Sequence, residues 1–270
     1  MAVSRLFATC SSCGPGCGVL QVIIVSECPV FRADLARSAR LLRSFRTESA
    51  DPAGYYSGLA GDTIRQLGQY TDLNGRIVVD VGGGPGFFVR ELRGAGARAF
   101  CVDTDSGELA AQGRPESGSA LGSALSLPLA SGAVDVCFSS NVLEHVPDWR
   151  AMMAEMVRVT RPGGIIFVAF TNWLSPWGGH ETSPWHYLGG ERAAARYQRR
   201  HGRPPKNRYG HSLHPVSVAA ALAWARSADA AVLVDAVPRY LPGWTRPLLR
   251  VGVLREFLTW NLLLVLRRAG

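Results

Sequence analysis

Short runs of apolar residues alternate along the chain with longer segments in which apolar residues recur every three or four positions. The runs are rich in β-branched residues, as in Ile77-Val78-Val79, and are typical of strands buried on both faces. Further runs occupy residues 98–102, 134–138, 165–170, 231–237 and 261–266. The segments between them are amphipathic at helical spacing, and Asp148 is a candidate cap for one of these helices. This alternation predicts an α/β fold with a doubly wound, mostly parallel sheet.

Two more amphipathic segments precede the first strand. The segment from Phe31 to Phe45 carries arginines on its polar side, so it can pack on the domain or lie on a membrane surface. A second helix is expected from Tyr55 to about Gly68. Residues 1–29 are rich in Gly, Ser and Cys and lack a periodic pattern, so we expect a flexible tail there and one domain over residues 30–270.

The strongest local signal follows the first strand, where Asp80 precedes glycines at alternate positions, Gly82, Gly84 and Gly86. Glycines let the backbone approach a ligand that any Cβ would obstruct, and the next helix presents unpaired N–H groups to it. The spacing fits neither the dinucleotide fingerprint G-x-G-x-x-G nor a phosphate loop, which needs a lysine after its last glycine. Asp103, 17 residues after Gly86, ends the next strand and can accept hydrogen bonds from both hydroxyls of a ribose.

These motifs resemble those of the class I S-adenosylmethionine-dependent methyltransferases, whose first motif reads D-x-G-x-G-x-G as residues 80–86 do here. Leu127-Pro128 and the turn at Pro162-Gly163-Gly164 are similar to elements of the small-molecule (type 11) subgroup. That subgroup includes ubiquinone and menaquinone methyltransferases, and the match extends to uncharacterised actinobacterial methyltransferases. The resemblance implies a seven-stranded Rossmann-like sheet whose last strand, residues 261–266, runs antiparallel to its neighbours.

The resemblance also implies S-adenosylmethionine as the cofactor and indicates how it is held. An acid at the end of the first strand would approach its methionine end, the glycines would pass beneath it, and the acid after the second strand would hold its ribose. At the adenine, the family has an acid where this chain has Ser123, whose hydroxyl can still accept a hydrogen bond. The predicted cofactor-binding residues are Asp80, Gly82, Gly84, Gly86, Asp103, Thr104, Ser123, Ala124 and Asn141.

Residues 171–215 are rich in Trp, Gly, His and Pro and are predicted to form a lid inserted after the fifth strand. Because ligands of open α/β sheets bind at the carboxyl ends of the strands, Trp177, His180 and His186 are candidates for binding the methyl acceptor. His145 follows the fourth strand and is the candidate catalytic base for an acceptor that must lose a proton. A histidine that only caps the next helix is the alternative interpretation.

No metal is expected from the sequence. Cys10, Cys13 and Cys17 lack a second C-x-x-C or a histidine pair, and Glu181 with its neighbouring histidines lacks a conventional ligand spacing.

The composition, with 47% hydrophobic and 19% charged residues among 270, suits one large α/β domain. The net charge of +8 comes almost entirely from arginines spread along the chain, so nucleic-acid binding is not indicated. Peripheral contact with an anionic membrane remains open, although no apolar run is long enough to span one, and a cytoplasmic protein is the default. The oligomeric state is not indicated.

The predicted activity is methyl transfer to a small-molecule acceptor, with a hydrophobic or lipid-like acceptor favoured by the aromatic lid. An NAD-dependent oxidoreductase is one alternative, against which the glycine spacing argues. The other is a non-catalytic protein that binds the same cofactor, supported by the missing acid at Ser123.

Overall fold

The computed structural model describes residues 3–5, 23–25, 31–48 and 50–270. The predicted tail, with Cys10, Cys13 and Cys17, lies outside the described residues except for two short strands. These strands, β1 (Val3–Arg5) and β2 (Ile23–Val25), pair with each other antiparallel. Residues 1–31 and 32–270 are separate compact units, and the candidate site belongs entirely to the second.

The second unit is built on a seven-stranded sheet with the order β5-β4-β3-β6-β7-β9-β8. β9 is antiparallel to both of its neighbours, and the other adjacent pairs are parallel, which confirms the predicted fold. The strands are β3 (Ile77–Val81), β4 (Arg98–Asp103), β5 (Ala120–Leu121), β6 (Val134–Ser140), β7 (Thr160–Phe170), β8 (Ala231–Pro238) and β9 (Leu262–Arg268).

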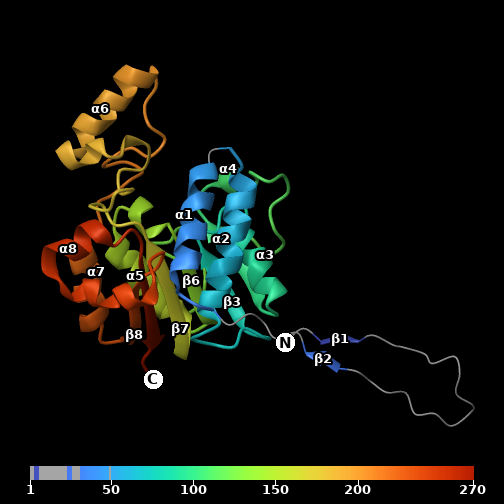
Figure 1. Cartoon of the computed structure of the whole chain (residues 1–270). Helices are drawn as coiled ribbons and strands as arrows, with labels where there is room; N and C mark the ends of the chain where they lie inside the picture. The colour runs from blue at the N-terminus through green and yellow to red at the C-terminus, as the bar shows by residue number, and fades with distance from the viewer. Residues whose placement is uncertain (1–2, 6–22, 26–30, 49) are drawn as a thin grey trace, which may run out of the picture. The chain divides into compact units, whose positions relative to one another are not determined.

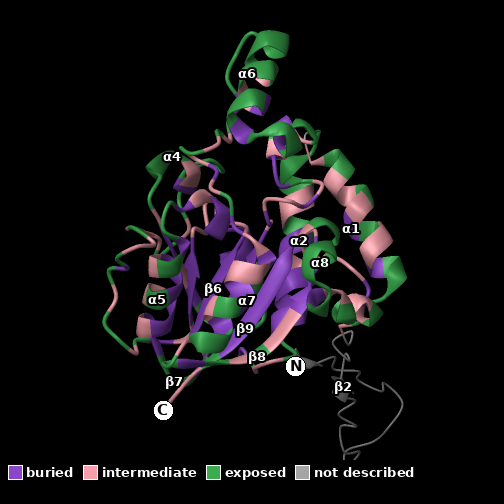
Figure 2. Ribbon diagram, turned by 90° about the vertical axis from the view of Figure 1, so that its left-hand side faces the viewer, coloured by how far each residue is buried: buried purple, intermediate pink, exposed green. Residues whose placement is uncertain are grey.

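Helices cover both faces of this sheet (Figure 1). α1 (Leu35–Thr47), α2 (Pro52–Leu67) and α3 (Phe87–Gly94) pack on one face, whereas α5 (Trp149–Val159) and α7 (Val218–Ser227) pack on the other. Each face has its own hydrophobic core, so the central strands are buried on both sides, as their continuous apolar runs predict (Figure 2).

Capping side chains fix where several helices begin. Asp148 accepts hydrogen bonds from the backbone N–H groups of Arg150 and Ala151 at the start of α5, as predicted.

The expected turn at 162–164 lies instead within the bounds of β7, because the pairing of β6 with β7 shifts register between Val134 and Val136. Gly163 has a φ of 74° there, so the bulge still uses a glycine for its conformation.

A buried ion pair joins α1 to α2. The Arg37 guanidinium donates to Asp62, with 2.6 Å between Nη2 and Oδ2, and also donates to the backbone carbonyl of Arg239 after β8. Arg37 and Asp62 are both almost fully buried. α1 is therefore packed on the domain through Arg37 and Leu41, while its arginine-rich side is exposed.

The segment predicted as the lid, residues 171–215, contains η2 (His180–Thr182), η3 (Trp185–Leu188) and α6 (Gly190–His201). α6 is mostly exposed (Figure 2). The remaining elements are α4 (Ser106–Leu109), η1 (Leu143–His145), η4 (Gly243–Arg250) and α8 (Gly252–Leu258). Among the described residues, no helix combines the length and apolarity needed to cross a membrane.

Candidate functional site

A cleft of about 640 Å³ opens at the carboxyl ends of β3, β4 and β6. Its walls come from the glycine-rich turn after β3, from Asp103 to Asp105 after β4, and from Ser140 to Val142 after β6. This is the edge at which open α/β sheets bind their ligands, because several strands end there and their loops diverge. The sequence motifs and the cleft therefore coincide.

The glycines of the turn have different tasks. Gly82, Gly84 and Gly86 all have positive φ, which L side chains rarely adopt. A Cβ on Gly82 would lie 2.5 Å from a methyl carbon of Val142, so this glycine is needed for packing. A Cβ on Gly84 would meet no atom of the described residues within 4 Å, and Gly84 lines the cleft. Gly84 therefore leaves room for a ligand that approaches the backbone.

Two carboxyl groups lie at the strand ends beside this turn. Asp103 accepts hydrogen bonds from the backbone N–H groups of Gly84 (3.0 Å) and Asp105 (2.9 Å), and it lines the cleft. Asp80 is buried beneath the turn, and its Oδ2 has no hydrogen-bond partner among the described residues. Burial, with the nearby charge of Asp103 as a smaller cause, raises the pKa of Asp80 to about 8.

Most of the other predicted cofactor residues also line the cleft. Thr104, Ser123, Ala124 and Asn141 are on its wall, whereas Gly86 is not. A Cβ on Gly86 would meet the side chain of Glu116. The hydroxyl of Ser123 accepts a hydrogen bond from the backbone N–H of Leu125, which orients it at the cleft edge.

Asn141 lies where the cleft meets a second, narrow pocket, since it lines both. It adopts a φ of 60°, and its side-chain oxygen accepts hydrogen bonds from Ser140 (3.0 Å) and Arg239 (3.2 Å). Arg239 is almost fully buried and also donates to Thr63. This network holds the Asn141 side chain at the boundary between the two spaces.

The second pocket is lined mainly by apolar and aromatic side chains. They come from α1, α2, the lid and the segments beside β8 and β9, and include Leu41, Phe45, Tyr55, Trp177, Tyr240 and Trp260. The rings of Phe45 and Trp177 are 5.0 Å apart between centroids, so the lid meets α1 here. Of the predicted acceptor-binding residues, Trp177 thus lies next to the cleft.

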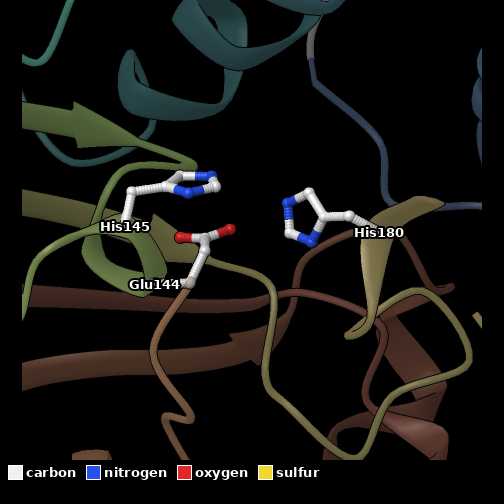
Figure 3. Close-up of side chains that lie close together, drawn as sticks. All are labelled: Glu144, His145 and His180. Carbon is white, nitrogen blue, oxygen red and sulfur yellow. The ribbon is translucent and has the colours of Figure 1, made fainter. Parts of the chain in front are cut away.

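Glu144, His145 and His180 form a histidine–carboxylate cluster beside the cleft (Figure 3). One ligand-type atom from each residue lies within 4.8 Å of those of the other two, and the side chains point toward a common centre. His145 follows β6 and lines the cleft, while His180 comes from the lid. The fold therefore brings together one predicted catalytic residue, one predicted acceptor-binding residue and a carboxylate that sequence reasoning missed.

The third predicted acceptor-binding residue, His186, lies elsewhere. It is almost fully buried, lines neither the cleft nor the apolar pocket, and contacts the carbonyl of Ser175 at 3.2 Å. Its ring packs against Trp173 and Tyr187 within the lid.

The lid also contributes residues that the sequence did not single out. Lys206, Asn207 and Ser212 line the cleft, and the Lys206 ammonium pairs with Glu108 of α4 over 3.1 Å. Tyr56 of α2 also lines the cleft. Lys206 is the single lysine in the sequence, and this was the one sequence feature that could have pointed to it as a functional residue.

Comparisons with known proteins agree with this arrangement. A family model described as a methyltransferase domain matches residues 79–168. An uncharacterized methyltransferase of Mycolicibacterium paratuberculosis is 50% identical over 246 residues, covering 87% of this chain and 96% of the relative. One from Mycobacterium marinum is 47% identical, covering 87% of this chain and 95% of the relative. The crystal structure of an S-adenosylmethionine dependent methyltransferase from Mesorhizobium loti aligns with this structure with a TM-score of 0.54 at 20% sequence identity. The alignment covers 79% of this chain and 100% of that one, so the two proteins share the fold.

Proposed function

The chain belongs to the methyltransferase family of its mycobacterial relatives, and we propose that it transfers the methyl group of S-adenosylmethionine to a small hydrophobic acceptor. The family membership decides against the oxidoreductase alternative. The observation that carries the proposal is the cleft itself, in which Gly84 and Asp103 face open space at the carboxyl ends of adjacent strands.

The residues of the cleft fit the cofactor. Asp103 offers carboxylate oxygens to paired ribose hydroxyls, and Ser123 with Ala124 borders the region for an adenine. Asp80, which the resemblance assigns to the methionine end, is buried beneath the turn and does not itself line the cleft. When bound, the cofactor supplies an electrophilic methyl group on sulfur, so the chain's main task is to align the acceptor with it.

We propose His145 as the catalytic residue for an acceptor that must lose a proton. Its Nδ1 lies 2.6 Å from the carbonyl oxygen of Ser212, which can only accept a hydrogen bond, so Nδ1 carries the hydrogen. The neutral ring then has its lone pair on Nε2. Because His145 lines the cleft, this nitrogen is available to an acceptor bound beside Asn141.

The hydrophobic nature of the acceptor follows from the apolar pocket. It shares Asn141 with the cleft, so a group bound in it would be adjacent to the cofactor's reactive end. Aromatic side chains such as Tyr55, Trp177 and Trp260 suit an apolar ligand with a polar reactive end.

An anionic membrane surface is the proposed source of such an acceptor. η4 and α8 expose Trp244, Val253 and Leu254 at 77%, 72% and 50% of their surfaces. The exposed Arg246 and Arg250 lie in the same segment. Exposed apolar residues interspersed with arginines are typical of segments that lie in a membrane interface.

Calorimetric titration with S-adenosylmethionine tests the cofactor site, with Gly84→Ala and Gly75→Ala as a matched pair. Both glycines have positive φ, and neither would place a Cβ within 4 Å of a protein atom, but of the two only Gly84 lines the cleft. We expect similar losses of Tm and at least a tenfold loss of affinity in Gly84→Ala alone. Equal affinity in the two variants would contradict the proposed site.

Transfer of a labelled methyl group into cell extract then tests the acceptor class. We expect label in the fraction that partitions into organic solvent, and much less label with Gly84→Ala at the same cofactor concentration. Label confined to the aqueous fraction would overturn the hydrophobic acceptor while leaving the methyltransferase activity intact.

A further inference from the structure

A single catalytic base would not require both a second histidine and a buried carboxylate beside it. The geometry of the histidine–carboxylate cluster points to a binding site for a divalent transition-metal ion. We propose that Glu144, His145 and His180 bind such an ion beside the cleft (Figure 3). The proposal that the ion binds depends only on the residues of this cluster. The proposal that the ion takes part in catalysis depends on the proposed function as well.

The first feature of the cluster is the buried carboxylate of Glu144. This side chain is almost fully buried, and among the described residues no arginine or lysine pairs with it. Its Oε1 accepts a hydrogen bond from the backbone N–H of Thr171 at 2.9 Å, while its buried Oε2 has no partner in the described part of the chain. A buried carboxylate without a compensating cation is costly, and a bound cation removes that cost.

The second feature is the hydrogen bonding of the two imidazole rings. The bond from Nδ1 of His145 to the Ser212 carbonyl fixes the tautomer and leaves Nε2 as a donor to a metal, the usual outer-shell arrangement for a metal-bound histidine. Nδ1 of His180 is buried and has no hydrogen-bond partner among the described residues. A neutral imidazole is the form that binds metal.

The third feature is the spacing of the donor atoms. No hydrogen bond joins any two of the three side chains, although one ligand-type atom from each lies within 4.8 Å of those of the other two. Donors around one tetrahedral zinc ion lie roughly 3.4 Å apart, so shifts of about 1 Å would complete the coordination.

Two histidines and one carboxylate are a donor set that binds Zn²⁺ or Fe²⁺ and leaves coordination positions open. With His145 on the cleft wall, an open position can take an oxygen of the acceptor. The ion would lower the pKa of a hydroxyl acceptor, whose proton passes to solvent water. The oxygen then forms a bond to the methyl carbon as the carbon–sulfur bond breaks and its electron pair remains on sulfur. In this state His145 acts as a ligand and not as the base.

The test is titration of the chelator-treated, full-length protein with Co²⁺, followed by calorimetry and absorption. Glu144→Gln is the principal variant, because its amide oxygen can still accept the bond from Thr171. His180→Gln is the second variant, and His211→Gln, an exposed histidine of the lid, is the matched control. We expect one equivalent bound by the wild type and the control, and at least tenfold weaker binding in both cluster variants.

The absorption spectrum separates the cluster from the cysteines near the N-terminus, since thiolate ligands give intense near-ultraviolet bands with Co²⁺ and imidazole with carboxylate does not. Equal Co²⁺ affinity in wild type and Glu144→Gln, or thiolate bands alone, would overturn the proposal and make the cluster a contact that holds the lid. S-adenosylmethionine titrations of the same samples report separately on the proposed function. If the cofactor binds and Co²⁺ does not, only the metal site fails.

Discussion

The carboxylate of Asp103 accepts a hydrogen bond from the backbone N–H of Gly84 at 3.0 Å, so the end of β4 is tied to the glycine-rich turn after β3. The bond uses Oδ2, while Oδ1 accepts from Asp105. Each carboxylate oxygen has a further lone pair, which leaves Asp103 able to accept from a ligand in the cleft. One residue thus shapes the turn and offers an anchor to the cofactor.

We expect Asp103→Ala to weaken S-adenosylmethionine binding at least tenfold, since hydrogen bonds to a carboxylate contribute about 1.5–3 kcal/mol. The loss of the Gly84 bond should also lower the free energy of unfolding, by about 1 kcal/mol. Calorimetry and urea denaturation measure the two effects, with Asp105→Ala as the neighbouring control. If Asp105→Ala loses affinity and Asp103→Ala does not, the ribose contact belongs to Asp105.

Asp80 should make stability depend on pH. Its pKa is raised to about 8 in the folded protein, whereas in the unfolded chain it ionises near 3.9. Between these values the folded state binds more protons, so the free energy of unfolding falls as pH rises from about 4 to 8. Asp80→Asn removes this pH dependence. The variant should therefore gain stability relative to the wild type as pH rises from 5 to 9.

Urea denaturation at pH 5, 7 and 9 measures this difference, with Asp229→Asn as a control for an exposed carboxyl group. The measured quantity is the difference in free energy of unfolding between the wild type and Asp80→Asn. If this difference is the same at all three pH values, Asp80 is already ionised in the folded protein.

The ion pair of Arg37 and Asp62 should contribute far more to stability than a surface pair. Asp62→Ala leaves the buried Arg37 guanidinium without its carboxylate, for which we expect a loss of about 3–5 kcal/mol. Arg246 pairs with Asp235 but its side chain is 53% exposed, so Arg246→Ala should cost about 1 kcal/mol or less. Chemical denaturation of both variants measures the two losses in free energy of unfolding. Equal losses would contradict the claim that burial makes the Arg37–Asp62 pair more important for stability than the exposed pair.

Local patterns sufficed to predict the sheet, the glycine-rich turn and Asp103. Buried strands, turns and helix caps leave signals within a few residues, and Asp148 is an example that the structure confirms. Because His180 and Glu144 are far apart in the sequence, only the docking of the lid brings them together. The same holds for Lys206 at the cleft and for Arg239 beside Asn141. Long-range contacts made by irregular segments have no periodic signal.

The proposed membrane contact predicts co-sedimentation with anionic vesicles at low salt. The exposed apolar side chains of η4 and α8 would enter the interface, and the neighbouring Arg246 and Arg250 would attract anionic lipid. We therefore expect the protein to pellet with phosphatidylglycerol vesicles and to be released as salt rises, because the electrostatic part is screened. Neutral vesicles should retain much less.

The variant Val253→Glu places a carboxylate in the centre of this apolar segment and should reduce pelleting several-fold. Val232→Glu is the matched control, because Val232 is also exposed, at 63% against 72% for Val253, but lies on the edge strand β8. Equal pelleting of the two variants would place the lipid contact outside α8. If the wild type does not pellet with anionic vesicles at low salt, the surface contact is wrong and the apolar pocket must receive its acceptor from solution.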